Sequence, residues 1–495
     1  MAGKSQVCKI ARFLIAILWT EQESIMNTYD VIIVGSGPAG IFAALELISA
    51  KKNLKIILLE KGDDLPDRKP HDIFHGWGGA GTFSDGKLNL STAVGGFLTD
   101  YIGEGELESL IDYVDKIFLK YGAPDELHGT DEAEIKRLEE ISARNGLRLV
   151  PFKIRHLGTD RCFSLLKNLR QTLTPSLGTD LIHMGRTVPT GQGGVDIHFN
   201  AEAIEILKQG DKVTGIKTGD GKEFLGDFVI LAPGRSGSHW LSEESKRLGL
   251  STGNNPVDIG VRVEVPASIM RPITDVMHEA KLLFYSKRFD DLVRTFCMNP
   301  YGVVVKEKHK DFCTVNGHSF STKKTNNTNF AILASTTFTE PFHEPIAYGQ
   351  YIAKLVNLLG EGIIVQRLGD LLQGRRSTPE RIKKGSVKPT LTDATPGDLS
   401  FAIPYRYISD ILEMLEVLDK IAPGVYSTST LLYGAEVKFY SMRLKLTNDL
   451  ETEVKNLFAA GDGAGITRGI IHAAVSGVVA AREILKRAAN STASV

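Results

Sequence analysis

The hydrophobic pattern near the start of the chain predicts a strand, a turn and a helix in immediate succession. Residues 30–34 (DVIIV) form a continuous apolar run rich in β-branched residues, which is typical of a strand buried on both faces of a parallel sheet. The glycine-rich segment 35–40 (GSGPAG) follows, and the spacing over 41–50 is helical. A second apolar run at 55–59 (KIILL) predicts a neighbouring strand that ends on Glu60.

After residue 100 the chain is predicted to contain further strands and helices, and their pattern changes near residue 256. Residues 105–145 have an acidic, helical pattern that indicates a solvent-facing connection. Next we expect a helix at 161–173 and strands at 195–199, 203–207, 213–218 and 228–231. From about 256 to 430 the pattern changes to alternating strands, such as 259–265, 302–305 and 330–333, with one long helix near 346–359. The chain returns to a strand at 456–460 and ends in a helix at 471–486.

The first turn has the spacing of a dinucleotide-binding fingerprint. Gly35, Gly37 and Gly40 follow the pattern GxGxxG between a strand and a helix, and Glu60 lies twenty residues after the last glycine. Gly35 allows the tight turn, Gly37 lets the backbone approach a pyrophosphate, and Gly40 lets the helix pack closely on the strand. Glu60 is expected to accept hydrogen bonds from the adenosine ribose.

The remaining glycine-rich segments favour FAD over a nicotinamide nucleotide. Residues 461–465 (GDGAG) lie between a strand and a helix, so Asp462 can accept from a ribityl hydroxyl while backbone N–H groups face the pyrophosphate or the flavin. Residues 191–194 (GQGG) lack the flanking strand and helix of a second fingerprint. The expected cofactor is non-covalent FAD, with NAD(P)H acting at most as a transient reductant.

These elements predict an α/β architecture in which a discontinuous Rossmann-like FAD/NAD(P)-binding domain carries an inserted α+β substrate domain. The active site is expected at the interface of the two domains. The expected divisions are an N-terminal extension at 1–26, FAD-binding segments at 27–100, 181–255 and 436–490, a helical connection at 101–180 and the insertion at 256–435.

Seven sequence blocks carry a resemblance to known proteins. They read WGGAGTFSDGKLN from Trp77, RHLGTD from Arg155, IGVRVEVP from Ile259, TFCMNPYG from Thr295, VNGHS from Val315, GAEVKFY from Gly434 and GDGAGITRGI from Gly461. With these blocks the chain resembles the glutathione-reductase-type FAD superfamily, and more closely a family of poorly characterised FAD-dependent dehydrogenases. The resemblance implies the fold and FAD, and it leaves the substrate open. Residues 232–234 (APG) stand where many relatives have a threonine.

The residues expected to contact FAD come from the two glycine-rich turns, the ends of strands and the segment 77–87. They are Gly35, Ser36, Gly37, Pro38, Ala39, Gly40, Glu60, Lys61, Gly78, Gly79, Gly81, Thr82, Ser84, Asp85, Ala203, Ala232, Gly234, Gly461, Asp462, Gly469 and Ile470.

Four residues are candidates for catalysis: Arg468, Lys87, Glu436 and His318. Arg468 could hold a substrate carboxylate through its planar guanidinium, or it could pair with Glu436. Lys87 could stabilise an anionic reduced flavin, or lie in a loop that merely wraps the cofactor. Glu436 and Lys438 share one face of a strand, as substrate contacts or as an exposed charge pair. His318 is a candidate general base.

Other reactive residues have plainer interpretations. His156 is a second candidate for the general base, whereas His472 fits a packed position on a helix of small residues. The basic run at 375–384 is typical of a solvated face. Cys297 and Cys313 are expected as small buried hydrophobes.

Composition narrows the functional class. The 495 residues carry 58 Lys and Arg against 59 Asp and Glu, and this balance gives no support for a nucleic-acid partner. Four cysteines without metal-ligand or CxxC spacing support neither a zinc site nor a disulfide framework, so we expect no metal and a cytoplasmic location. The apolar run at 10–19 is too short to span a bilayer and leaves a weaker alternative of membrane association.

The sequence therefore predicts an FAD-dependent oxidoreductase that transfers a hydride between the flavin and a small organic molecule, with an anionic substrate as one option. Two alternatives remain at this point. One is a flavoenzyme that uses reduced FAD without net redox, as an isomerase, cyclase or RNA-modifying enzyme does. The other is a non-catalytic flavoprotein that passes electrons to a partner protein. The oligomeric state is not predicted.

Overall fold

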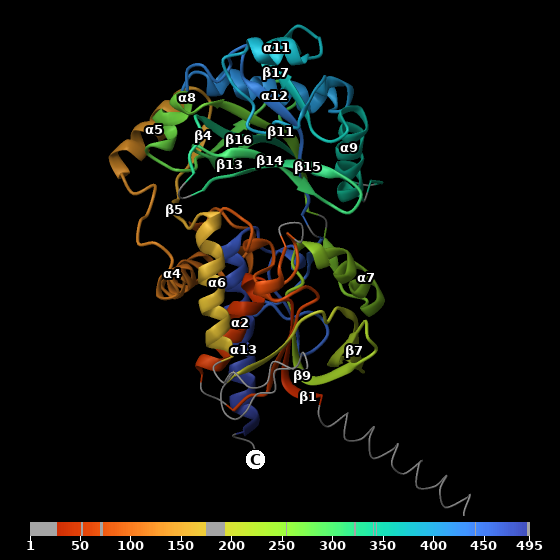
Figure 1. Ribbon diagram of the computed structural model, residues 1–495. Coiled ribbons are helices and arrows are strands. Elements are labelled where there is room, and N and C mark those ends of the chain that lie inside the picture. The colour runs from red at the N-terminus through yellow and green to blue at the C-terminus, as the bar shows by residue number, and fades with distance from the viewer. Residues whose placement is uncertain are drawn as a thin grey trace, which may run out of the picture.

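The structure is a computed structural model that describes residues 27–50, 53–69, 73–174, 194–253, 255–320, 323–339, 341–342, 344–440 and 442–492. It has two lobes, each built around one large sheet (Figure 1). The expectations for residues 10–19 and for most of the segment 191–194 lie outside the described residues.

The lower lobe of Figure 1 contains a seven-stranded sheet in the order β6-β2-β1-β9-β8-β7, with β21 also paired to β9. The parallel strands are β6 (Val195–His198), β2 (Ile56–Leu59), β1 (Thr28–Val34), β9 (Glu223–Leu231) and β21 (Leu457–Ala459). The antiparallel strands β7 (Ala203–Gln209) and β8 (Lys212–Thr218) join the first part of β9. N-terminal, middle and C-terminal segments thus share one sheet, which confirms the predicted Rossmann-like α/β fold.

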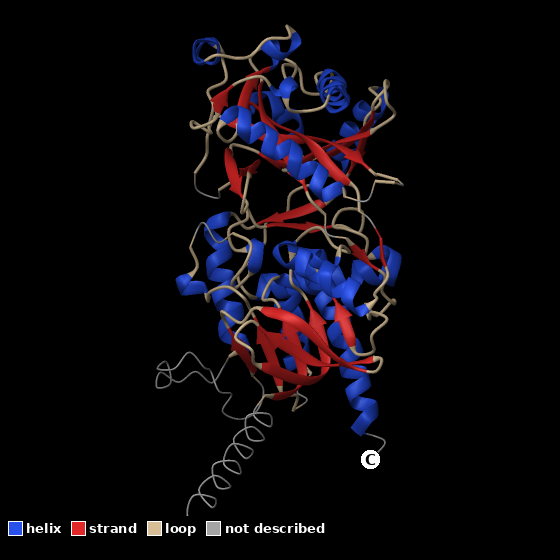
Figure 2. Cartoon of the chain, turned by 90° about the vertical axis from the view of Figure 1, so that its right-hand side faces the viewer, coloured by secondary structure: helices blue, strands red, loops and turns tan. Residues whose placement is uncertain are grey.

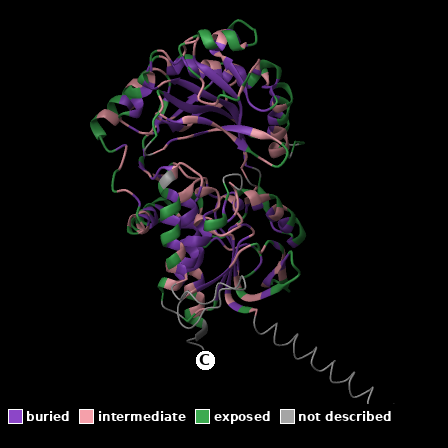
Figure 3. Ribbon diagram, in the orientation of Figure 1, coloured by how far each residue is buried: buried purple, intermediate pink, exposed green. Residues whose placement is uncertain are grey.

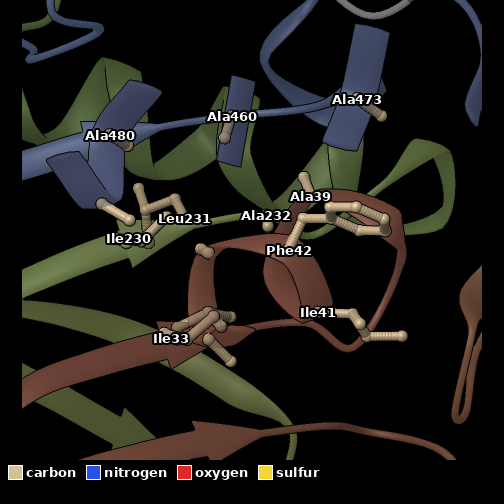
Figure 4. Packing of buried hydrophobic residues seen from close by; sticks show 14 of the residues in the cluster. Ile33, Ala39, Ile41, Phe42, Ile230, Leu231, Ala232, Ala460, Ala473 and Ala480 are labelled. Carbon is tan, nitrogen blue, oxygen red and sulfur yellow. The ribbon is translucent and has the colours of Figure 1, made fainter. Parts of the chain in front are cut away.

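Two helices of small residues pack against each other beside this sheet. Helix α2 (Pro38–Ser49) follows the first glycine-rich turn, and α13 (Ile470–Thr492) follows the second. They approach so closely that a side chain on Gly477 would overlap the Ala39 carbonyl. Figure 4 shows Ala39 of α2 and Ala473 of α13 in the same buried cluster as the strand residues around them. This contact fixes both glycine-rich turns at one edge of the sheet.

The acidic segment at 105–145 is less solvent-facing than its composition suggests. It forms α4 (Glu104–Lys120) and α5 (Glu132–Arg144), each with charged residues outside and a narrow apolar stripe inside. Helix α4 buries Leu107, Ile111 and Val114 in the core of the lower lobe. Helix α5 contributes Leu138 to the core of the upper lobe instead. The predicted helices and their exposed charged faces are present, and the buried apolar stripes were not predicted because a stripe of this period is easily hidden among glutamates.

The upper lobe contains an eight-stranded, mainly antiparallel sheet in the order β18-β17-β19-β11-β16-β13-β12-β4. Its strands are β18 (Thr395–Pro396), β17 (Ile364–Arg367), β19 (Leu431–Lys438), β11 (Val257–Pro266), β16 (Asn327–Thr336), β13 (Leu292–Asn299), β12 (Lys281–Tyr285) and β4 (Arg148–Val150). Strand β4 comes from the expected helical connection, and β19 continues past the expected boundary at 435/436. The upper lobe is therefore not assembled from one continuous insertion.

Most helices of the upper lobe cover one face of this sheet (Figures 1 and 2), whereas α11 (Pro379–Lys384) packs through Ile382 against the opposite face, with Val365 and Tyr433. The helices on the first face are α8 (Ala267–Thr274), α9 (Pro345–Gly360), α10 (Leu368–Leu372) and α12 (Tyr405–Leu418). The apolar positions of β11 alternate, so Ile259, Val261 and Val263 pack into the core while Arg262 and Glu264 lie on the opposite face. Figure 3 shows buried residues filling both lobes. The upper sheet thus places buried charged groups on the face away from its apolar core.

Smaller elements complete the described chain. They are α3 (Thr99–Ile102), α6 (Thr159–Leu173), α7 (Ser238–Leu248), the paired strands β3 (Lys87–Leu90) and β5 (Lys153–His156), β10 (Thr252–Gly253) and β20 (Arg443–Leu444), and β14 (Val303–Lys308) and β15 (Cys313–His318). None of the described helices has both the length and the hydropathy needed to cross a bilayer.

Candidate active site

A cavity of about 330 Å³ extends from the first glycine-rich turn of the lower lobe to the upper lobe. Residues from both glycine-rich turns, from the end of β9 and from the segment 77–87 line its lower part. The upper lobe contributes Glu279, Phe296 and Cys297. One continuous space therefore joins the nucleotide-binding elements to the charged region between the lobes.

The first turn has the close approaches that its glycines predict. Gly35 has a φ of +100°, and a side chain there would overlap the Ala232 carbonyl. A side chain on Gly40 would overlap the Gly35 carbonyl, so this glycine serves the packing of helix on strand. Gly37 differs, because a Cβ there would meet no atom within 4 Å. Gly37 lines the cavity, so the open side of its backbone can receive a ligand.

Two further cavity-lining glycines have the same open geometry. A Cβ built on Gly234 or Gly469 would also meet no atom within 4 Å. Gly234 follows β9 and Gly469 immediately precedes α13, so the bare backbone surfaces come from three separate crossovers. At such positions a pyrophosphate can approach the backbone closely and reach the N–H groups at the start of the following helix. The residues present thus fit an extended dinucleotide such as FAD.

Glu60 lines the cavity but is already engaged by the protein. Its Oε2 accepts from Ser36 N at 2.9 Å and from Ser36 Oγ at 2.7 Å. Its Oε1 accepts from Gly62 N at 2.9 Å and Gly76 N at 2.8 Å. The carboxylate therefore ties the first turn to two other loops. A ribose hydroxyl would have to share these oxygens, so the predicted ribose contact stays a prediction.

Arg68 organises the glycine-rich segment 77–87. Its Nη1 donates to Trp77 O at 2.7 Å, to Gly79 O at 2.8 Å and to Thr82 Oγ1 at 2.5 Å. Gly78 donates its N–H to Ser36 O at 2.9 Å. Thr82 and Gly78 do not line the cavity, and neither does Gly40, so among the expected FAD contacts these three support the wall from behind. The other expected contacts all line it.

The second turn presents a buried carboxyl group. Asp462 Oδ1 accepts from Thr467 Oγ1 at 2.7 Å and from Gly469 N at 3.4 Å. Burial raises the pKa of Asp462, although Arg235 and Thr467 act in the opposite direction. The side chain lines the cavity, where the predicted hydrogen bond to a ribityl hydroxyl would satisfy it.

Lys87 lies at the centre of a charged cluster at the upper end of the cavity. Its Nζ is 3.0 Å from Asp85 Oδ2 and 2.9 Å from Glu279 Oε2, and it donates to Met298 O at 2.5 Å and Asn299 Oδ1 at 3.1 Å. Burial alone would lower the pKa of Lys87, but Asp85, Cys297 and Glu279 together raise it above its ordinary value. Lys87 therefore remains a fixed positive charge beside two carboxylates.

Glu436 does not reach the cavity. Its Oε2 accepts from Arg262 Nε and its Oε1 from Arg262 Nη2, both at 2.7 Å, and Lys438 Nζ lies 2.9 Å from Oε1. Burial would raise the pKa of Glu436, but Arg262 and Lys438 hold it below its usual value. The charge pair predicted for Glu436 and Lys438 is therefore present, but it is buried and not exposed. The alternative pair of Glu436 with Arg468 is not found among the described residues, and a substrate contact of Glu436 stays a prediction.

His318 also lies behind the cavity wall. Burial lowers the pKa of His318 despite the nearby Asp85 and Glu307, and its Nδ1 has no hydrogen-bond partner among the described residues. The second candidate base, His156, has its Nε2 3.0 Å from Ser319 Oγ and its ring stacked near His278 at 4.5 Å. Both histidines lower the pKa of Asp85 electrostatically, and their role as a general base stays a prediction.

Several lining residues were not found from the sequence. They are Phe74, His75, Ala80, Asn89, Glu202, Arg235, Trp240, Glu279, Phe296 and Cys297, with shorter side chains between them. Phe296 and Cys297 stand in the block TFCMNPYG, which offered a usable signal. Glu279 had none, because only the fold brings it to Lys87.

Comparisons with known proteins agree with this site. Residues 256–439 match the family model described as "FAD-dependent protein, C-terminal domain-like", and residues 30–81 match the model described as "Lycopene cyclase protein". The first description names FAD, the cofactor predicted from the sequence.

One relative and two solved structures are similar over most of the chain. An "Uncharacterized protein" of Clostridium beijerinckii is 28% identical over 92% of this chain and 80% of its own length. L-proline dehydrogenase from P. horikoshii has a TM-score of 0.42 at 12% identity, covering 93% of this chain and 94% of its own. Glycine oxidase from Geobacillus kaustophilus has a TM-score of 0.39 at 13% identity, covering 93% of this chain and 95% of its own.

Proposed function

We propose that the chain is an FAD-dependent oxidoreductase that transfers a hydride between FAD and a small organic substrate. The observation that carries this proposal is the continuity of the cavity. Its lower end is bounded by three open glycine backbones and its upper end by the Lys87 cluster, with Phe296 and Cys297 between the lobes. A cofactor held along the lower part would meet a substrate admitted at the upper part.

The upper end supplies fixed charge. Bound FAD would supply the acceptor or donor for the hydride. Lys87 retains its positive charge because Asp85 and Glu279 flank it, so it can stabilise negative charge that develops nearby. Asp85 has its pKa held down, against the effect of burial, by Lys87, His318 and His156, and it is therefore a carboxylate at neutral pH. The side chains of Lys87, Asp85 and Glu279 have little exposure to solvent, so their charges act on a substrate with little screening by water.

Gly37 provides the direct test of the cofactor site. A Gly37→Val side chain would occupy the open space beside the first turn without meeting protein atoms within 4 Å of its Cβ. We expect the variant to fold normally and to lose FAD affinity by at least about 100-fold, because the backbone can no longer approach the pyrophosphate. FAD titration followed by flavin fluorescence measures this change.

Gly253→Val is the matched control, since Gly253 is exposed, has equally open surroundings and lies outside the cavity. It should bind FAD like the unmodified chain. Equal FAD affinity in all three proteins would contradict the proposal, as would the absence of any FAD binding. If FAD binds, anaerobic titration with reduced metabolites and with NAD(P)H then tests hydride transfer through bleaching of the flavin absorbance.

The lycopene cyclase match does not favour a reaction without net redox. It covers residues 30–81, which belong to the nucleotide-binding part, and it includes none of the upper-lobe residues that line the cavity. A flavin that had to be reduced before turnover and stayed reduced after it would instead support that class.

A further inference from the structure

We propose that Arg468, which lines the cavity, forms a subsite for the carboxylate of an organic-acid substrate, and that Lys281 adds positive charge from outside the cavity lining. The inference rests on the proposed function of the cavity and names the substrate class for it. It follows from a local excess of positive charge that the described residues do not neutralise, and from guanidinium donors that have no acceptor.

Arg468 lines the cavity and has guanidinium N–H donors without an acceptor among the described residues. Its Nε and Nη2 are buried and have no hydrogen-bond partner among the described residues, although its backbone N donates to Gly95 O at 2.7 Å. The guanidinium carbon lies 3.5 Å from the centroid of the Tyr440 ring and 4.7 Å from the centroid of the Phe97 ring. The aromatic rings fix its plane and leave its edge, the part that binds carboxylates in pairs of hydrogen bonds, without an acceptor.

Lys281 adds a second positive charge, and its side chain has no ion-pair partner among the described residues. It begins β12, two residues after the cavity-lining Glu279, and its side chain makes no hydrogen bond or ion pair within the described part of the chain. Burial, Arg294 and Arg468 lower its pKa to about 8, and Glu279 and Asp258 act weakly in the opposite direction. Burial is the largest of these effects, and an anion bound nearby would offset both burial and the two arginines.

The carboxylates of Asp258 and Glu279 already have hydrogen-bond and ion-pair partners in the protein. Asp258 accepts from Arg294 Nη2, from Tyr440 Oη at 2.6 Å and from Ser335 Oγ at 2.5 Å. Glu279 pairs with Lys87 at 2.9 Å and accepts from Cys297 N at 3.2 Å. Arg294 is therefore neutralised by Asp258, while the charges of Arg468 and Lys281 remain. A buried orphan guanidinium is unfavourable unless a ligand completes it, and a carboxylate does so with two hydrogen bonds.

The test is calorimetric titration of the FAD-loaded protein with benzoate and malonate, and with benzamide and malonamide as neutral counterparts. We expect the carboxylates to bind at least about ten-fold more tightly than the amides at pH 7. Arg468→Gln should weaken carboxylate binding by about ten-fold or more and leave amide binding unchanged, and Arg468→Lys should restore part of the loss. Equal binding of carboxylates and amides would overturn the proposal.

Arg443→Gln is the matched control. Arg443 stacks on the same Phe97 ring at 4.4 Å, but it pairs with Asp100 at 2.7 Å and does not line the cavity. This variant should bind carboxylates like the unmodified protein. A loss of carboxylate affinity equal to that of Arg468→Gln would show that the effect is general and would overturn the assignment.

Two further measurements distinguish a carboxylate-binding role of Arg468 from a role in binding FAD and from an effect of misfolding. Between pH 7 and 9, carboxylate affinity should fall as Lys281 loses its proton, and Lys281→Met should abolish this pH dependence even if Arg468→Gln folds poorly. If Arg468→Gln weakens FAD binding and leaves carboxylate binding intact, the guanidinium serves the cofactor and the proposal fails. If the chain binds no FAD, the proposed function fails, whereas the same titrations without FAD still decide the carboxylate subsite.

Discussion

Arg262 and Glu436 meet through two parallel hydrogen bonds of 2.7 Å inside the upper sheet, and neither side chain is exposed to solvent. They come from neighbouring strands β11 and β19, where Gly260 is opposite Glu436, and 174 positions separate them in the chain. Arg262 Nη1 also donates to Cys297 O at 2.9 Å. The pair therefore positions the cavity-lining Cys297 without touching the cavity itself.

We expect Glu436→Gln to act on stability before it acts on chemistry. Removing one partner of a buried pair leaves Arg262 and Lys438 uncompensated, which should lower the free energy of unfolding by roughly 3–5 kcal/mol. Urea unfolding measures the change. The exposed pair of Arg137 and Glu134 provides a control, because Glu134→Gln should change stability by less than about 1 kcal/mol. Full stability combined with loss of turnover would instead return Glu436 to the list of catalytic residues.

Lys87→Met should be most damaging at high pH. The pKa of Asp85 is held below its ordinary value of 3.8, so its ionised form contributes stability above that pH and the contribution is lost as pH falls through the folded pKa. Without Lys87 the carboxylates of Asp85 and Glu279 lose their cation, and we expect a loss of roughly 2–4 kcal/mol at pH 8. At pH 5 the loss should be smaller, because a carboxyl without its cation protonates more easily. Denaturant unfolding at the two pH values checks this, and a loss that does not vary with pH would contradict it.

Asp410→Asn should stabilise the protein at neutral pH. Burial raises the pKa of Asp410 from 3.8 to about 6, with the neighbouring Asp291 acting in the same direction. The folded state thus binds more protons than the unfolded state between these values, so stability decreases as pH rises through this range. Asparagine removes the buried charge and should add roughly 1–3 kcal/mol at pH 7.5, since one pKa unit corresponds to about 1.4 kcal/mol.

Little difference between Asp410→Asn and the unmodified chain is expected at pH 4. Thermal or urea unfolding across this pH range measures the effect. Glu416→Gln, an exposed change on the same helix, should shift stability by less than about 0.5 kcal/mol at either pH. A destabilised Asp410→Asn variant at pH 7.5 would show that the carboxylate makes a favourable interaction in the folded state.

Gly477→Ala should separate α13 from α2. The added Cβ would overlap the Ala39 carbonyl, which belongs to rigid helix backbone, so the helices must shift. We expect a loss of roughly 1–3 kcal/mol and weaker FAD binding, because α2 and α13 follow the two glycine-rich turns. Gly105→Ala is the control, as Gly105 lies within helix α4 in open space and should gain up to about 1 kcal/mol. Equal stability of both variants would contradict the close contact.

The sequence predicted the residues that line the lower, nucleotide-binding part of the cavity better than those that line its upper end. Gly35, Gly37 and Gly40 are recognisable because their roles depend on local spacing between a strand and a helix. Arg68 was missed although it holds the segment 77–87 in place, since a single arginine in a loop has no pattern. The same applies to Glu279, which reaches Lys87 only through the packing of the two lobes.

Charged side chains show most clearly which features can be predicted from the sequence and which depend on the tertiary structure. The sequence by itself determined the parallel sheet, the two glycine-rich turns and the choice of FAD, because backbone conformation and apolar periodicity are properties of short segments. Only the tertiary structure decided that Glu436 pairs with Arg262, while Nε and Nη2 of Arg468 find no acceptor among the described residues. The physical reason is that an ion pair depends on strand register and side-chain direction across many intervening residues, and neither is encoded in the local pattern.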